Sequence, residues 1–553
     1  MILCSGYGLG FNFIEEVKIL GTILFLCAYS FIVMLFCAGS SPFIDSMTVD
    51  SSVFFTIGRG MVAGKVPYLD LFDHKGWYIY FINYLGALIS PNNTTGLFLI
   101  ECCFAATNSI LLYAISKPFI TEKIKRLIFT LIMLCASLNY FTYEGGNMTE
   151  AYTLTFQLIA FFLVIRYYKS EQVKHSPTLM FTHGLCVGIV LGLRANMAAM
   201  WGAIAIVIAW RLLSHKEYKN FAANFFAGLA GIIVALAPPI IYGSLTGSLD
   251  AMFRDYILFN LLYTGSGSLI TKIMSSYDTH FSIGRKMLRF TFITVFSNIV
   301  FCCLNCKRFI KVMFVLGWGF SFLAILISGR GHPHYFETLM PFLIPLVVLL
   351  INNVHVPISF IKFRRDSKAV DLFFSLHIRF SSEDKEKAES HKILRIVSLV
   401  ALIFVITIHG NSYMSMSFSK THKSLSAFIS ELKTRYEELK QNHDVHILST
   451  GNRAIFYNKL NVIPHIKYFY APGMPYNEYP FPLDEQVESI LNNNNDIIVV
   501  NYVGRTENDN KLIFATHNYN YPYNEKIMQH MIQNYDLVLE DSERQMWIKK
   551  RKD

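Results

Sequence analysis

The sequence predicts an all-α, multi-pass membrane domain followed by a small α/β domain outside the membrane. Of the 553 residues, 53% are hydrophobic and only 16% are charged, and the mean hydropathy is +0.37, which is too apolar for a soluble chain of this length. About eleven segments approach the roughly 20 apolar residues that a membrane-spanning helix needs. After residue 408 the composition changes abruptly to a polar tail rich in Asn and Tyr. We therefore expect a membrane domain over residues 1–409 and a second domain over 410–553.

The distribution of basic residues predicts the topology. The first apolar segment, residues 19–38, follows Glu15, Glu16 and Lys18 and lacks a small-residue cleavage pattern, so we expect an uncleaved anchor. The net charge of +10 comes largely from Lys and Arg in short loops, which is typical of cytoplasmic loops and not of a nucleic-acid-binding surface. These loops are residues 117–126, 166–175, 211–219, 306–311 and 362–392, the last within a long loop over 354–392.

With those loops in the cytoplasm, the following spans alternate consistently if each crosses once. They are residues 97–115, 127–139, 152–165, 179–193, 197–210, 221–241, 287–303, 312–327, 336–351 and 393–408. Counting residues 76–90 as another span would move the basic residues at 123–126 to the outside. We therefore predict a juxtamembrane helix there, lying on the outer face within a first outer loop over 39–96. The C-terminal domain is then extracytoplasmic.

The tail shows mixed periodicity. Apolar residues recur at helical spacing from Leu425 to Leu439, whereas residues 445–448, 497–502 and 535–539 have the composition of short strands. The sequence therefore predicts a small α/β domain docked on the outer face, and no catalytic motif is evident in it.

Polar residues near the ends of the predicted spans fall overwhelmingly on the outer face. Charged groups at a membrane boundary are costly unless they are paired or functional, so their convergence predicts one shared site, with ordinary solvated loop ends as the alternative. The residues are Asp45, Asp50, Asp70, Asp73, His74, Lys75, Tyr143, Glu144, Asn147, Glu150, Arg194, Asn196, Arg330, His332, His334, Tyr335 and Glu337.

The first outer loop carries a family resemblance. It reads DSSVF at residues 50–54, GRG at 58–60, GKVPY at 64–68, DLFDHKG at 70–76 and YFI at 80–82. These motifs resemble the first outer loop of bacterial GT-C glycosyltransferases, which are related to the protein mannosyltransferases and the lipid A aminoarabinose transferases. Weaker likenesses at 145–150, 192–196 and 334–336 extend the resemblance over about residues 17–351. Many relatives have a second acid where this chain has Ser51 and a proline where it has Trp77.

The resemblance implies a GT-C type fold and sugar transfer from a polyprenyl-phosphate-linked donor to a cell-surface glycan or lipid-linked acceptor, with inversion, at the outer face of the bacterial cytoplasmic membrane. Asp50 aligns with the loop aspartate of the family and is the expected base, with Asp73 as a second catalytic candidate. A leaving phosphate needs cations and hydrogen-bond donors. The expected substrate and phosphate ligands are Lys75, His74, Arg194, Arg330, His334, Tyr335, Glu150 and Asn147.

Each candidate also has a structural interpretation. Asp50 could cap a helix that begins near Ser51, and Asp73 could be a turn residue paired with Lys75 or Arg59. Asp70 could equally serve the turn after Pro67.

Other polar groups leave similar alternatives open. Glu144 and Glu150 could end helices, and Glu101, inside an apolar run, could hold helices together. His332 and His334 have a metal-ligand spacing, but Pro333 separates them and no matched third ligand is evident, so a divalent cation stays open and no cofactor is required.

The sequence also allows two rival functions. A lipid-linked oligosaccharide polymerase, flippase or transporter would place ionisable residues near the middle of the membrane in paired repeats, and no repeat is visible. A non-catalytic surface assembly protein would bind its partner through the tail. The expected partners of the favoured enzyme are the donor, the acceptor and membrane lipids.

Overall fold

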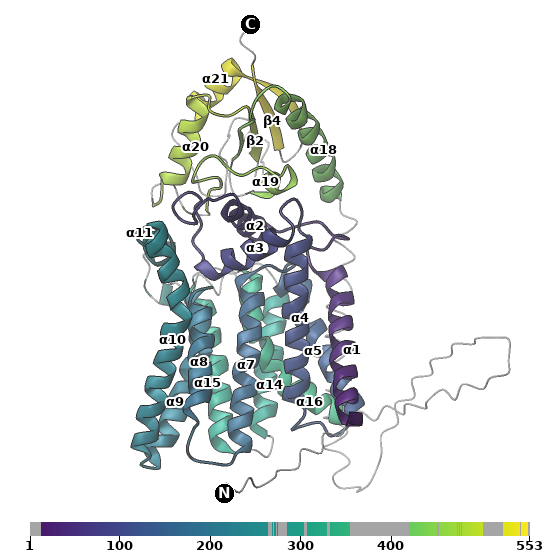
Figure 1. Ribbon diagram of the computed structural model, residues 1–553, viewed down its shortest axis with the longest axis vertical. Helices are drawn as coiled ribbons and strands as arrows, with labels where there is room; N and C mark the ends of the chain where they lie inside the picture. Colours follow the sequence, from purple (N-terminus) through teal and green to yellow (C-terminus); the bar gives the residue numbers. More distant parts are fainter. Residues whose placement is uncertain are drawn as a thin grey trace, which may run out of the picture.

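The computed structural model has a long bundle of helices with a small mixed α/β unit at one end (Figure 1). It describes residues 13–263, 285–303, 307–328, 332–353, 420–450, 453–472, 478–501, 524–541 and 544–550, together with isolated positions at 268, 270, 271, 274, 474 and 476. The predicted loop over 354–392, the last predicted span over 393–408 and Arg330 lie outside the described residues.

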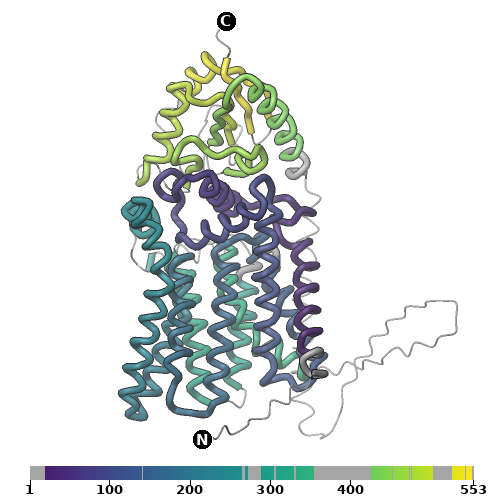
Figure 2. The backbone as a smooth tube through the Cα atoms, viewed as in Figure 1, coloured from purple at the N-terminus to yellow at the C-terminus, as the bar shows by residue number. Residues whose placement is uncertain are grey.

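The bundle helices coincide with the predicted spans. Seven helical segments in the described part of the chain are long and apolar enough to cross a membrane, and three shorter apolar helices accompany them. The bundle consists of α1 (Phe13–Cys37), α4 (Thr95–Ser116), α5 (Lys123–Ser137), α7 (Thr149–Lys169), α8 (Pro177–Leu191), α9 (Ala199–Ser214), α10 (Tyr218–Thr246), α14 (Arg285–Cys303), α15 (Arg308–Ile327) and α16 (Ile344–Asn353). The backbone tube shows these segments running side by side along the long axis (Figure 2).

Short elements at the helix ends shape the candidate site. The region predicted as a juxtamembrane helix forms α3 (Trp77–Ile89), which packs on α2 (Val49–Val62) and α4 at the end of the bundle next to the tail (Figure 1). The other short elements are α6 (Tyr140–Tyr143), η1 (Ala195–Ala198), α11 (Leu249–Met252), the π-helix η2 (Phe253–Leu258), α12 (Phe259–Tyr263) and the 3-10 helix η3 (Pro333–Leu343).

The tail contains a four-stranded sheet in the order β1-β2-β4-β3. β1 runs parallel to β2, with Ile447 opposite Ile497, and the β2–β4 and β4–β3 pairs are antiparallel. The sequence predicted three of these strands and missed β4. The elements are α18 (Lys420–Lys440), β1 (Ile447–Ser449), α19 (Ile455–Lys459), α20 (Phe481–Leu491), β2 (Ile497–Asn501), α21 (Asn524–Asn534), β3 (Tyr535–Glu540) and β4 (Arg544–Lys549).

The tail packs directly on the α2–α3 segment. One hydrophobic cluster includes Phe54 and Tyr80 from that segment together with Tyr457, Phe469 and Tyr470 from the tail. Since these side chains are buried in the same cluster, the tail forms part of the wall around the candidate site.

Candidate functional site

Asp50 lies in the first turn of α2, at the end of the bundle that faces the tail. Thr48 caps this helix, because its side-chain oxygen accepts a hydrogen bond from the Ser51 backbone N–H. The alternative that Asp50 is the cap is therefore wrong. Its side chain is 38% exposed and its carboxylate lies 3.9 Å from Lys75 Nζ, so the residue is accessible and has a cation nearby.

Asp73 is buried, with 2% of its side chain exposed. Its carboxylate accepts hydrogen bonds from Tyr80 Oη at 2.9 Å and from Tyr470 Oη, and His74 Nδ1 lies 3.3 Å away. The carboxylate of Asp73 thus forms its ion pair with His74, and the charge of Lys75 acts on it only through space. Arg59 instead donates to the backbone carbonyls of Pro91 and Tyr457. Asp73 is thus fixed in position on several sides.

Lys75 connects the two aspartates. Its Nζ lies 2.8 Å from His74 Nε2 and faces Asp50. Two tyrosines fix the backbone here, because Tyr68 Oη donates to the Lys75 carbonyl and the Lys75 N–H donates to Tyr80 Oη. Asp70 belongs to the preceding turn, where its carboxylate accepts from the Val66 N–H at 2.7 Å. The structure therefore supports the turn interpretation for Asp70.

Arg194 and Glu150 form a second charged pair at this end of the bundle. Arg194 Nη1 donates to Glu150 Oε1 at 2.8 Å, and the guanidinium lies over the Tyr335 ring at 4.0 Å from its centroid. Glu150 is only 2% exposed. A guanidinium suits such a place, because it is weakly hydrated and can stack and hydrogen-bond at once.

His334 lies between two carboxylates. Its Nδ1 is 3.2 Å from Glu144 Oε2 and its Nε2 is 4.0 Å from Glu150 Oε1. The ring of His332 stacks on it with centroids 5.3 Å apart. Among the described residues, no group of three or more His, Cys, Asp and Glu could hold a metal ion.

The turn between α6 and α7 explains the role of Asn147. Glu144 and Asn147 have φ values of 49° and 52°, and the two glycines between them have 83° and 85°, so four successive residues are left-handed. Asn147 donates its backbone N–H to Glu101, and its side chain bonds to Asn83, Ser51 and Tyr152. This side chain, predicted to contact substrate, is occupied in joining α2, α3 and α7.

Glu101 is likewise a structural group. Its carboxylate accepts hydrogen bonds from Ser40 Oγ, from Tyr143 Oη at 3.3 Å and from the Asn147 N–H at 2.6 Å. The interpretation that it holds neighbouring segments together is supported.

The charges of the two clusters act on each other. Burial by itself raises the pKa of Asp50, but Lys75, His334 and His332 lower it, and the net result is a pKa below the usual value. Burial also raises the pKa of Asp73, whereas its contacts with His74 and Tyr470 and the charge of Lys75 bring it down to about 2. Both aspartates are therefore ionised at neutral pH, beside cationic and neutral basic groups.

Sequence reasoning missed the residues that the tail contributes. Tyr470 donates to Asp73, Lys467 Nζ lies 3.0 Å from the buried Asp255, and the Lys467 carbonyl accepts from the Phe72 N–H. The aromatic residues near position 470 form no sequence pattern that points to an aspartate in a distant loop, so no local signal could have identified these contacts.

Among known proteins, the chain resembles solved structures by fold but matches no sequence family. No family model matches the chain, and no curated protein matches it. ArnT from Cupriavidus metallidurans bound to undecaprenyl phosphate aligns with a TM-score of 0.53 at 11% identity, over 96% of this chain and 98% of that one. The apo state of the same protein aligns over the same shares with a TM-score of 0.46 at 10% identity. The first of these alignments shows that the chain has an ArnT-like fold, which confirms the fold that the first outer loop predicts.

Proposed function

We propose that this protein transfers a sugar from a polyprenyl-phosphate-linked donor to a hydroxyl group of a cell-surface glycan or lipid-linked acceptor. The observation that carries the proposal is the accessible side chain of Asp50, which lies 3.9 Å from Lys75 Nζ and feels the charge of His334 within an ArnT-like fold. His334 in turn lies beside the Arg194–Glu150 pair. The solved ArnT structure contains undecaprenyl phosphate, which supports a polyprenyl-phosphate-linked substrate.

In this proposal Asp50 is the general base. It accepts the proton of the acceptor hydroxyl as that oxygen bonds to the anomeric carbon, while the bond from the same carbon to the phosphate oxygen breaks. Attack opposite the leaving group inverts the anomeric centre. Asp50 suits this role better than Asp73, because Asp50 is 38% exposed whereas Asp73 is buried among its partners. A positioned base contributes about 10²–10⁴-fold to such a rate.

The departing phosphate is an anion that needs positive charge rather than a proton. Arg194, Lys75 and His334 supply donors at this end of the bundle, with Tyr335 stacked against the arginine. Asp73 is a positioning residue in this scheme, because it holds His74 beside the Lys75 ammonium.

We also propose that the site lies at the outer face of the bacterial cytoplasmic membrane. The basic loops between the predicted spans favour cytoplasmic placement of the opposite end. Residues 1–409 then form the membrane domain, and residues 410–553 form an extracytoplasmic domain that covers the site through Tyr470 and Lys467.

The test compares cells that express the wild type, Asp50→Asn, Asp45→Asn or no protein. Asp45 is a matched control, because it is an exposed aspartate of the same outer segment that pairs with Lys459. Mass spectrometry of surface glycans and lipids should show a sugar-sized increment with the wild type and Asp45→Asn only. An increment that persists with a stably inserted Asp50→Asn protein would refute the assignment of the base. No increment with any expressed protein would favour a transporter or assembly function.

A further inference from the structure

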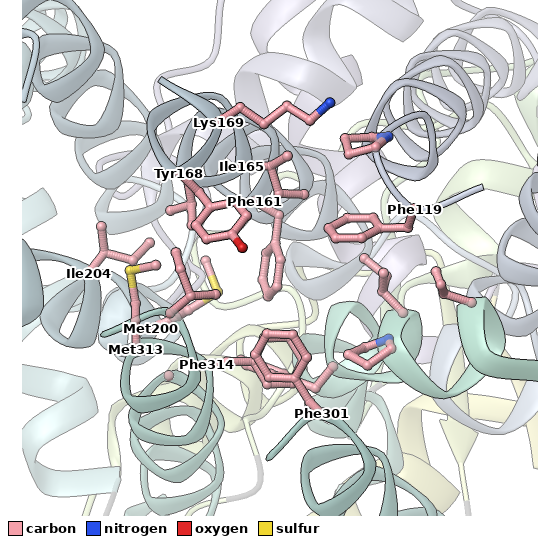
Figure 3. Close-up of a pocket in the computed structure, with 18 residues that line it drawn as sticks. Phe119, Phe161, Ile165, Tyr168, Lys169, Met200, Ile204, Phe301, Met313 and Phe314 are labelled. Carbon is pink, nitrogen blue, oxygen red and sulfur yellow. The ribbon is translucent and has the colours of Figure 1, made fainter. Parts of the chain in front are cut away.

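A large apolar cavity lies inside the bundle, near the end opposite the candidate site. Its volume is about 400 Å³, and side chains from α7, α9, α14, α15 and α16 line it. Figure 3 shows Phe161, Met200, Phe301 and Phe314 around the open space, with Lys169 at its edge. This volume falls within the range of about 300–1,000 Å³ that is typical of small-molecule sites.

The walls of this cavity suit a hydrocarbon chain. Aromatic rings, methionines and branched aliphatic side chains make up nearly all of the lining. The aromatic rings and the thioether groups of Met200 and Met313 adapt to a flexible apolar partner. Such a lining offers few hydrogen-bond partners to a sugar or a polar peptide.

A lysine lies at the edge of the cavity. Lys169, in the last turn of α7, contributes to the lining and is exposed. The next basic side chain, Lys307, lies over the ring of the lining residue Tyr168 at 5.6 Å and pairs with Glu171 at 3.6 Å. Basic pockets between membrane helices on the cytoplasmic side are typical sites for anionic lipid headgroups.

The cavity mouth is separate from the proposed transfer site. Glu150 lies in the first turn of α7 and Lys169 is its last residue, so the helix places them roughly 28 Å apart. A donor phosphate at Arg194 therefore cannot also contact Lys169.

We propose that this cavity binds an anionic phospholipid of the cytoplasmic leaflet, with one acyl chain between α7, α9 and α15 and the phosphate at Lys169. The opposite signs of the phosphate and the lysine, and the apolar space directly below the lysine, support this occupant over a polar one. The proposal rests on the membrane orientation proposed above but not on the sugar transfer.

The glycines of α15 provide a matched pair of variants. Gly317 lines the cavity, and a Cβ there would meet Phe342 Cζ at 3.4 Å and Met200 Cγ at 3.6 Å, which is ordinary contact. Gly317→Leu therefore places its branched end in the cavity without a backbone clash. Gly319 lies on the same helix and has nothing within 4 Å of an added Cβ, so Gly319→Leu is the control.

The charge at the mouth needs its own pair. Lys169→Gln removes the proposed phosphate partner, and Lys216→Gln removes an exposed lysine of another loop that does not line the cavity. The probes are phosphatidylglycerol and phosphatidylethanolamine, with undecaprenyl phosphate as a competitor. They are added to the full-length protein in detergent, and binding is measured by native mass spectrometry and thermal unfolding.

The wild type, Gly319→Leu and Lys216→Gln should retain phosphatidylglycerol in preference to phosphatidylethanolamine and should melt at higher temperature with it. Gly317→Leu should lose both effects. In Lys169→Gln the preference for phosphatidylglycerol over phosphatidylethanolamine should fall about fivefold, which is the effect typical of one basic residue at an anionic membrane surface.

Three results would overturn the proposal. The first is equal retention of both lipids by the wild type. The second is undiminished binding by the folded Gly317→Leu variant, or by Lys169→Gln should the glycine variant fail to fold. The third is displacement of phosphatidylglycerol by undecaprenyl phosphate, which would assign the cavity to the donor lipid.

Discussion

Replacing Tyr470 with phenylalanine tests whether the tail takes part in the site. The change removes one hydroxyl, which donates to the carboxylate of Asp73 from the far side of the domain contact. A hydrogen bond to a charged group contributes about 1.5–3 kcal/mol. The pKa of Asp73 is about 2 against 3.8 for an ordinary aspartate, and this difference corresponds to roughly 2.4 kcal/mol of stability at neutral pH, shared among its partners.

The sign of the pH dependence follows from the lowered pKa of Asp73. Because the folded state favours the ionised form, this stabilisation is fully present above about pH 4 and is lost as the pH falls through about 2. Tyr470→Phe should therefore lower the melting temperature at pH 7, and the difference from the wild type should shrink in acid.

The assay is thermal unfolding of the purified full-length protein between pH 7 and pH 3, together with the transfer rate. Tyr468→Phe is the matched control, because the Tyr468 hydroxyl bonds to Tyr479 Oη at 3.1 Å and not to a carboxylate. A neutral hydrogen bond of this kind contributes about 0.5–1.5 kcal/mol. If Tyr470→Phe and Tyr468→Phe have the same melting temperature and the same pH dependence, the coupling between the tail and Asp73 is refuted.

Two further predictions concern the charged groups of the site. Arg194→Ala leaves the buried carboxylate of Glu150 without its guanidinium partner and should lower the free energy of unfolding by about 3–5 kcal/mol. The double variant Arg194→Ala/Glu150→Ala should regain most of the melting temperature but no transfer activity. Recovery of transfer in the double variant would contradict a role of Arg194 in phosphate binding. Lys75→Met should raise the pKa of Asp50, because the lysine charge lowers it, so the acid limb of the kcat/KM profile should move to higher pH, and an unmoved limb would mean that Asp50 is not the titrating base.

The sequence by itself determined the membrane architecture, because burial in lipid requires long apolar helices, and such a helix is recognisable from one continuous stretch of sequence. The predicted spans over 97–115 and 152–165 correspond to α4 and α7, and residues 76–90 form the short helix α3. The Asp50 loop was identified by local motifs that occur together within 33 residues, from 50 to 82.

Only the tertiary structure decided which polar groups meet. It showed that Asp50 is accessible whereas Asp73 is buried, and that Arg194 pairs with Glu150. It also showed that the Asn147 side chain links neighbouring helices by hydrogen bonds. It also brought Tyr470 to an aspartate 397 positions away in the sequence. Such contacts depend on how separate segments pack in space. The order of side chains along the chain does not specify which distant residues become neighbours.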